Sequence, residues 1–482
     1  MDENGEKHYA CYFDEYERLQ MPAGGNGYYT LADRYAVTSN AYCYLDTENE
    51  YYYNESTGTL YYYTENGTDG KSFARPTMDN LLKFENVGGL RFEGITFTGV
   101  DDYYLTENNH FGTQAAGDHN IGTTYAGGFP DRAAIYLKNV SDVSIKNCQF
   151  VELGCEGITA RGWMTDIVIE ECTFKNIGAA AMRFGENYRE HEQQLWVDGA
   201  IGNKDIDILN NYLENISLDY LTPALQLTTC MNVNVKYNTV KNTAYTGISI
   251  GWTWGTPTVD RGYVTNLENV DISYNFISGF CNRGDDGGAI YVLGRPYSTI
   301  KEEDHTYINR MHHNYILYDR GTGDCKGGLN AGLYLDGSSS NWHVLKNVIV
   351  APAYGAAEGE TDYEKYGITA EIAERMQYNR ELMIMIFPQW VSNQQARNIL
   401  MEGNYLLGMR SEDEAEQYKE AFKVYMDKSL TGKEPEERGL ILKDTTYVVG
   451  TSWIPSEAGR IIESCGSKGA KGIVSDIMDF IY

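Results

Sequence analysis

Proline, positive charge and long apolar runs are all scarce in this sequence, and each shortage excludes something. Only 10 of the 482 residues are proline while 50 are glycine, a balance that suits many tight turns. Lysine and arginine total 39 against 68 acidic residues, which leaves a net charge of −29. Nucleic acid needs a basic binding surface, so a nucleic-acid partner is excluded and a polyanionic substrate is disfavoured. Solubility alone would explain the acidity equally well.

No run of about 18 apolar residues occurs, so we expect no membrane-spanning segment. The nine cysteines are odd in number and lack paired short spacings, which argues against a disulfide framework and a zinc site. We therefore expect no metal and no cofactor. The N-terminal "MDENGEKHYACYF" has neither a basic region nor an apolar core, so we expect no secretory signal there. An extracellular location would need an upstream segment, and otherwise the cytoplasm is expected.

The sequence does contain a repeated pattern between residues 80 and 410. An apolar alternation, a polar turn and a second alternation recur, and the second reads "SIKNCQF", "NVKYNTV" or "VLKNVIV". Aligned on its apolar residues, it forms one column: Cys148, Cys172, Asn211, Asn238, Asn275, Asn314, Asn347 and Asn404. The shortest spacing, 24 residues from Cys148 to Cys172, is typical of a solenoid rung. Turn asparagines tolerate left-handed φ and can bond the asparagines above and below, so we expect an Asn ladder with the two cysteines as buried, inert thiols.

The first alternation aligns as well, from "AAIYLKN" to "AGLYLDG". The first and third apolar residues of each segment are expected to point inward. The residues between them are expected to point outward and form a first outward column: Tyr136, Thr159, Arg183, Gln226, Ser249, Tyr291 and Tyr334. The next outward position gives a second column: Lys138, Arg161, Gly185, Thr228, Gly251, Leu293 and Asp336. Both columns would line one extended concave face, which suits a polymer or an oligomer.

The spacing and the ladder resemble the right-handed parallel β-helix, an all-β solenoid. We expect this solenoid, with the catalytic site, in residues 80–410. Residues 1–79 are rich in tyrosine and turns and read as a β-rich flank packed on it. Residues 411–482 read as a helical and capping segment, in which "PSEAGRIIESCG" forms a short helix. Helical spacing of charged residues predicts further short peripheral helices.

Carboxylates mark two neighbouring rungs of the expected face. Asp336 ends the strand pattern "GLYLD", and "NRGDDGGAIYVLG" carries Asp285 and Asp286 before the strand of Tyr291. Glycoside hydrolysis needs two acids: one protonates the leaving oxygen, and the other acts as nucleophile or activates water. Asp336 lies beside Tyr334 in the sequence and close to Trp342, an apolar setting that favours it as the acid, with Asp286 as base or nucleophile.

Aromatic and charged side chains near these acids form the candidate substrate site. Aromatic rings stack on the apolar faces of sugars. The candidates lie in or beside the outward columns: Trp252, Trp254, Tyr291, Tyr334, Arg295, Asp285, Arg183, Glu186 and Glu156.

The proposed pair of acids meets a geometric objection. An acid beside glycine is common in turns, whatever the function. If the strands are aligned on their apolar residues, Asp286 and Asp336 lie seven extended steps apart, roughly 23 Å, whereas a catalytic pair needs about 5–10 Å. The pairing therefore requires Gly287 and Gly288 to fold the chain back, which adjacent glycines permit.

At these residues the chain resembles a known family. "DDGGAIYVLGRP", "GLYLDGSSSNWHVLKNVI" and "TGISIGW" are similar to segments of the parallel β-helix glycoside hydrolases of family 141, a group of α-L-fucosidases and xylanases. The "EYYYNESTGTLYYYT" flank and the "WIPSEAGRIIESCG" tail resemble segments that bracket the helix there, so the resemblance covers most of the chain. It implies a glycosidase of plant or host glycans whose catalytic aspartates are Asp286 and Asp336. The chain lacks the usual signal peptide and first strands of that family.

Two other functions fit the same pattern. A non-catalytic β-helix that binds an oligosaccharide or polysaccharide would need the aromatic residues but no facing acids. A polysaccharide lyase would recruit Lys138, Arg161 or Arg183 together with a calcium-binding cluster of acids. The acidic balance and the scattered acids make the lyase the weakest of the three.

Overall fold

A computed structural model describes the chain over the following residues. The described residues are 42–54, 56–68, 71, 73, 75–101, 111–114, 117–120, 132–185, 203–220, 222–228, 230–251, 267–284, 287–294, 307–317, 330–337, 339–351, 382–386, 396–409, 412, 439–449 and 454–468.

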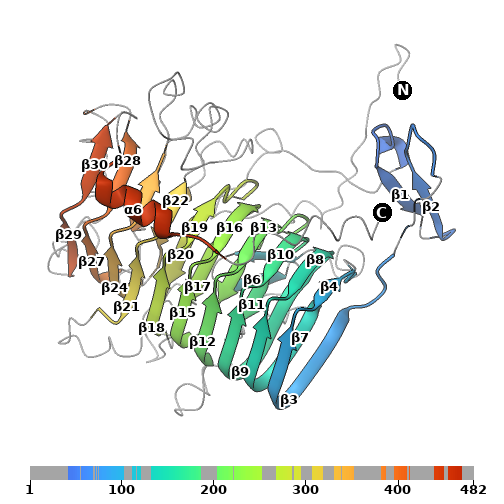
Figure 1. Cartoon of the computed structure of the whole chain (residues 1–482), viewed down its shortest axis with the longest axis horizontal. Helices are drawn as coiled ribbons and strands as arrows, with labels where there is room; N and C mark the ends of the chain where they lie inside the picture. The colour runs from blue at the N-terminus through green and yellow to red at the C-terminus, as the bar shows by residue number, and fades with distance from the viewer. Residues whose placement is uncertain are drawn as a thin grey trace.

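The described residues form a right-handed parallel β-helix, which confirms the predicted fold (Figure 1). Its coils stack side by side, from the first strands near the N-terminus to the last ones near the C-terminus. Three long strands turn a corner between two faces of the coil: β3 (Asn80–Glu93), β7 (Ala133–Lys146) and β9 (Glu156–Glu170). In β9, Ile158 pairs with Met182 on one face, whereas Thr165 pairs with Lys204 on the next.

The later coils have a separate strand on each of three faces. The first face continues with β11 (Met182–Phe184), β14 (Leu225–Leu227), β17 (Ile248–Gly251), β20 (Gly287–Leu293), β23 (Asn330–Leu335) and β26 (Leu382–Ile386). The second face continues with β12 (Asn203–Leu209), β15 (Cys230–Lys236), β18 (Glu268–Ser273), β21 (Asn309–His312), β24 (Ser340–Leu345), β27 (Arg397–Glu402) and β29 (Leu440–Lys443). The third face contains β4 (Thr96–Thr98), β8 (Gln149–Leu153), β10 (Thr173–Ile177), β13 (Tyr212–Ile216), β16 (Thr239–Thr243), β19 (Phe276–Ser278), β22 (Tyr315–Leu317), β25 (Val348–Val350), β28 (Tyr405–Met409) and β30 (Thr446–Val449).

The predicted Asn ladder runs through the core at the turn before the third face. From Asn211 to Asn347, each Nδ2 donates to Oδ1 of the asparagine on the next coil, at 2.9–3.0 Å. The ladder asparagines are buried, and Cys148 and Cys172 are buried free thiols at its N-terminal end, as expected. Because every amide also bonds backbone atoms, the ladder fixes the register of the coils as well as satisfying its own buried polar groups.

Two antiparallel hairpins form separate sheets that are not part of the stacked coils. Strands β1 (Tyr51–Asn54) and β2 (Thr59–Tyr62) form an antiparallel hairpin after the short 3₁₀ helix η3 (Tyr42–Tyr44), and the hairpin stands apart from the stack in Figure 1. A second antiparallel hairpin joins β5 (Phe111–Gln114) to β6 (Gly117–Asn120).

The stack continues past residue 410, where we expected the solenoid to end. Strands β29 and β30 pair in parallel with β27 and β28 and add one more coil. Helix α6 (Ser456–Ser464) forms where expected, but it does not close the end of the coil. Its Ala458, Ile461 and Ile462 pack on the outer side of the third face (Figure 1). None of the helices among the described residues is long and apolar enough to cross a membrane.

Candidate functional site

The first outward column exists in register but is not exposed. Strand pairing places one residue of each strand side by side, from Tyr136 through Arg183 and Gln226 to Tyr291 and Tyr334. All of these side chains are buried, with at most 1% of their surface exposed. The expectation of an open concave surface along this column is therefore wrong: the column is a buried polar row on the outer side of the first face.

Asp336, Tyr291 and Tyr334 meet at the C-terminal part of this row. The Tyr291 hydroxyl on β20 donates a hydrogen bond to Oδ2 of Asp336, which directly follows β23. The Tyr291 and Tyr334 rings meet edge to face, with their centroids 4.7 Å apart. Asp336 is 4% exposed. Sequence reasoning thus brought together one carboxylate and two aromatic rings from adjacent coils.

The backbone of Asp336 is held by the same two strands. Its N–H donates to the Val292 carbonyl at 2.9 Å, and its carbonyl accepts the Ser339 N–H at 2.9 Å. The Ser339 hydroxyl also donates to the Val292 carbonyl, at 2.9 Å. The turn after β23 is therefore tied to β20, which keeps the Asp336 carboxylate next to Tyr291.

Trp342 does not contribute to this environment. It lies on β24 of the second face, fully buried in the core of the coil. The expectation that it flanks Asp336 is wrong because the chain turns the corner between the two residues. Asp336 belongs to the second outward column and is buried beside Tyr291 and Tyr334 of the first.

The fold-back that the Asp286–Asp336 pair required does not occur at Gly287 and Gly288. Both glycines belong to β20 and pair in unbroken register with Asn330 and Ala331. The Gly287 N–H donates to Oδ1 of Asn330 at 3.1 Å, which holds the strand extended. Since Asp336 lies six residues beyond Asn330, roughly 20 Å of strand separates its level from that of Gly287. An Asp286–Asp336 pair would require the chain to turn back before Gly287.

Several predicted site residues lie outside the described residues. They are Asp285, Asp286, Trp252, Trp254, Arg295 and Glu186. Their participation in a substrate site stays a prediction.

Arg183 and Glu156 form a buried ion pair further along the row. Nη2 of Arg183 contacts Oε1 of Glu156, and both side chains are fully buried. The Thr159 hydroxyl donates to Oε2 of Glu156. Three strand spacings separate Arg183 from Tyr291, about 14 Å, so the ion pair belongs to the same row but does not touch Asp336.

Gln226 belongs to this row. The sequence analysis placed it in the first outward column but did not include it among the candidate substrate-binding residues. Its side chain is fully buried between Arg183 and Ser249. Within the described part of the chain, neither its Oε1 nor its Nε2 has a hydrogen-bond partner. The sequence signal that could have identified it is a glutamine at an outward position between two leucines, Leu225 and Leu227.

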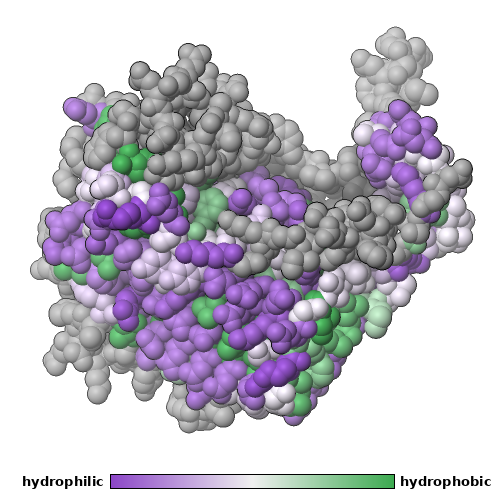
Figure 2. Space-filling model, viewed as in Figure 1, coloured by the Kyte–Doolittle hydropathy of each residue, from purple (hydrophilic) through white to green (hydrophobic). Residues whose placement is uncertain are grey.

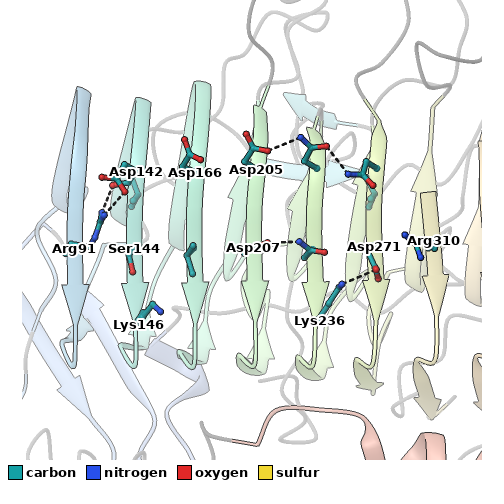
Figure 3. Close-up of a pocket in the computed structure, with 16 residues that line it drawn as sticks. Arg91, Asp142, Ser144, Lys146, Asp166, Asp205, Asp207, Lys236, Asp271 and Arg310 are labelled. Carbon is teal, nitrogen blue, oxygen red and sulfur yellow. Dashed lines mark hydrogen bonds and ion pairs between the residues drawn. The ribbon is translucent and has the colours of Figure 1, made fainter. Parts of the chain in front are cut away.

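A second surface feature is an open groove of about 800 Å³ on the outer side of the second face. Figure 2 shows that hydrophilic residues cover much of the described surface on the side seen in Figure 1. Asp142, Asp166 and Asp205 occupy corresponding turn positions on successive strands, each with a positive φ between 54° and 58° (Figure 3). Arg91 contacts Asp142 at 2.5 Å, and Asn232 donates to Asp205 at 2.9 Å. These bonds satisfy the turns of the coil, so the groove has a structural explanation.

Asp271 lies in the same groove within a network of cations. Burial would raise the pKa of Asp271, but its contacts with His312 and Lys236 outweigh burial and hold the pKa well below its usual range. Lys236 Nζ lies 3.0 Å and His312 Nε2 3.1 Å from the carboxylate. Among the described residues, no group of three or more His, Cys, Asp or Glu side chains is placed to hold a metal ion.

Comparison with known proteins supports the fold. The family model described as "Right handed beta helix region" matches residues 133–262. A solved structure titled "Glycoside hydrolase" superposes with a TM-score of 0.51 at 15% identity, over 90% of this chain and 61% of that one. The chain thus spans less than two thirds of that protein, and the likeness concerns the fold. A search of curated proteins finds no match.

Proposed function

We propose that the chain is a glycoside hydrolase acting on plant or host glycans, with Asp336 as one of two catalytic aspartates. The observation that carries the proposal is the buried Asp336 carboxylate, bonded by Tyr291 and next to a second aromatic ring. Burying a carboxylate on the outer side of a coil costs free energy of folding, so its presence there favours a functional role. Acid catalysis is such a role. The solved β-helix structure that it resembles is titled a glycoside hydrolase, which supports the same class.

The second acid of the proposal is Asp286, as the resemblance to family 141 implies, with Asp285 as the neighbour to compare. Trp252, Trp254, Tyr291 and Tyr334 would supply the aromatic contacts with the sugar. Fucosides and xylosides are the first substrates to test, because the resembling family contains fucosidases and xylanases.

The extended β20 favours one alternative, a non-catalytic glycan-binding β-helix. If Asp286 stays near the level of Asn330, no second acid is provided by that segment for Asp336. Such a protein would bind the glycan and leave its bonds intact.

A screen of aryl glycosides with wild type, Asp336→Asn, Asp286→Asn and Asp285→Asn tests the proposal. We expect the wild type to cleave a fucoside or a xyloside, and the first two variants to lose at least about 100-fold in turnover. Asp285→Asn should keep its activity. An inactive wild type that still binds xylan or fucosylated glycan would establish the alternative, and loss of that binding in Trp252→Ala would place the aromatic contacts.

Release of an unsaturated product that depends on calcium would indicate a lyase and overturn the hydrolase. Full activity of both Asp336→Asn and Asp286→Asn would remove this pair from the mechanism. If only Asp286→Asn stays active, Asp285 becomes the candidate for the second acid. Glu156, five strands from Asp336, lies too far away for this role.

A further inference from the structure

The side chain of Gln226 is a buried polar group that the fold itself does not use. It projects from β14 between Leu225 and Leu227, both of which belong to the hydrophobic core. Alternation along the strand therefore directs Gln226 to the outer side of the coil. The side chain is fully buried there, and among the described residues both of its amide atoms lack a hydrogen-bond partner.

Such a position is unfavourable for an amide unless something else bonds it. A buried donor and a buried acceptor that are both unsatisfied destabilise the fold, and an apolar side chain of similar size would avoid this. Sites that recognise ligands contain a small number of polar groups of this kind, which become paired only when the ligand is bound. Gln226 has the donor and the acceptor that two neighbouring sugar hydroxyls would match.

The register of the strands sets the distance of Gln226 from the proposed reaction centre. Ser249 and Tyr291 lie between Gln226 and the strand of Asp336, so three strand spacings, about 14 Å, separate them. Gln226 has no exposed surface in this structure and Asp336 almost none, so a ligand reaches both only once the row is uncovered. Such a ligand would lie across the strands, along the axis of the coil. That length exceeds a single sugar ring and corresponds to an oligosaccharide.

The charges along the row limit the chemistry of this ligand. On the other side of Gln226, Arg183 is paired with Glu156, so its positive charge is matched within the protein. The amide itself is neutral, and the chain has a net charge of −29. These properties favour an uncharged sugar unit with adjacent hydroxyls over a uronic acid.

We propose that Gln226 binds a neutral sugar unit of an oligosaccharide whose scissile bond lies at Asp336. Oε1 accepts a hydrogen bond from one hydroxyl and Nε2 donates to the next. The inference rests on the proposed glycosidase function for the position of the scissile bond, but the binding role of Gln226 can be tested without it.

The test compares Gln226→Leu with wild type on a short and a long substrate. The short probes are p-nitrophenyl xyloside and p-nitrophenyl fucoside, and the long probes are xylotetraose and fucosyllactose. We expect kcat/KM for the long probe to fall by about 10- to 100-fold, the loss of two hydrogen bonds, while the short probe changes less than about threefold. The thermal midpoint should stay equal or rise, because the substitution removes two unsatisfied buried atoms.

Gln149→Leu is the matched control. Gln149 is also a buried glutamine, 8% exposed and with Oε1 unpaired within the described residues, but it lies on β8 of the third face. It should leave both probes unaffected. Equal losses on short and long probes for Gln226→Leu, unchanged kinetics on both, or a lowered thermal midpoint would each overturn the inference.

A catalytically inactive wild type would contradict the proposed function and move the test to binding. Calorimetric titration with xylotetraose and fucosyllactose then decides: weaker binding by Gln226→Leu but not by Gln149→Leu supports the inference. Equal binding by all three proteins overturns it.

Discussion

The hydroxyl of Tyr291 donates a hydrogen bond to Oδ2 of Asp336, joining two adjacent coils on the outer side of the first face. Two opposite effects act on the ionised form of the Asp336 carboxylate. A donated hydrogen bond stabilises the ionised form, whereas the burial of Asp336 disfavours it. The bond also fixes the direction of Oδ2, so Tyr291 is a positioning residue for the proposed catalytic acid.

Tyr291→Phe should reduce kcat/KM on a cleaved aryl glycoside by about 10- to 100-fold while the fold stays intact. The substitution removes the donor, so the ionised carboxylate is less stabilised. Because Asp336 must be protonated to act as the acid, the basic limb of the pH–rate profile should move to higher pH. Tyr136→Phe, five strands away in the same row, is the control. An unchanged profile in Tyr291→Phe would show that the bond does not tune Asp336.

The fold was predictable because its signals are local. Alternation with period two is a property of short segments, and aligning it placed Asn238, Asn275 and Asn314 correctly in one ladder. The left-handed φ expected for these asparagines falls instead on the residue before each of them: Tyr237, Tyr274 and His313. The burial of the outward row was not predictable, because it depends on what else packs on that face. Sequence reasoning also could not decide the conformation at Gly287, since glycine permits a turn while the bond to Asn330 on another coil keeps the strand extended.

Asn275→Ala tests how much the ladder stabilises the coil. Asn275 donates to Asn314 at 3.0 Å and to the Val235 carbonyl at 2.8 Å, and it accepts bonds from Asn238. Removing it leaves buried partners unsatisfied, so we expect a loss of about 2–4 kcal/mol in the free energy of unfolding. Urea denaturation measures this loss. Asn234→Ala, in the Asn234–Asp207 contact on the outer side of the second face, should cost much less, and equal losses would contradict a special role for the core ladder.

Asp271 should make stability depend on pH in a defined direction. Burial would raise its pKa, but the contacts with His312 and Lys236 lower it below the unfolded value of about 3.9. The stabilisation is therefore fully present above about pH 4 and is lost as the pH falls toward the folded pKa. Asp271→Asn should cost about 2 kcal/mol near pH 7, with a difference from wild type that shrinks below about pH 4.

Urea denaturation at several pH values gives this comparison. Asp444→Asn is its control, because the Asp444 side chain is 73% exposed. A difference between wild type and Asp271→Asn that stays constant down to about pH 3 would show that the network does not depend on the charge of Asp271.

Variants of the buried Arg183–Glu156 pair distinguish a structural role of the pair from a contact with the substrate. Removing one partner leaves an uncompensated buried charge, so Arg183→Met and Glu156→Leu should each lower the free energy of unfolding by about 3–5 kcal/mol. The double variant replaces both charges with apolar groups and should recover most of that loss. We expect its kcat/KM on the glycan to stay low if these residues contact the substrate, as the sequence predicts. Restored stability together with full activity would show that the pair has only a structural role. In that case Gln226 would be the first residue of the row, counted from this pair, that contacts the sugar.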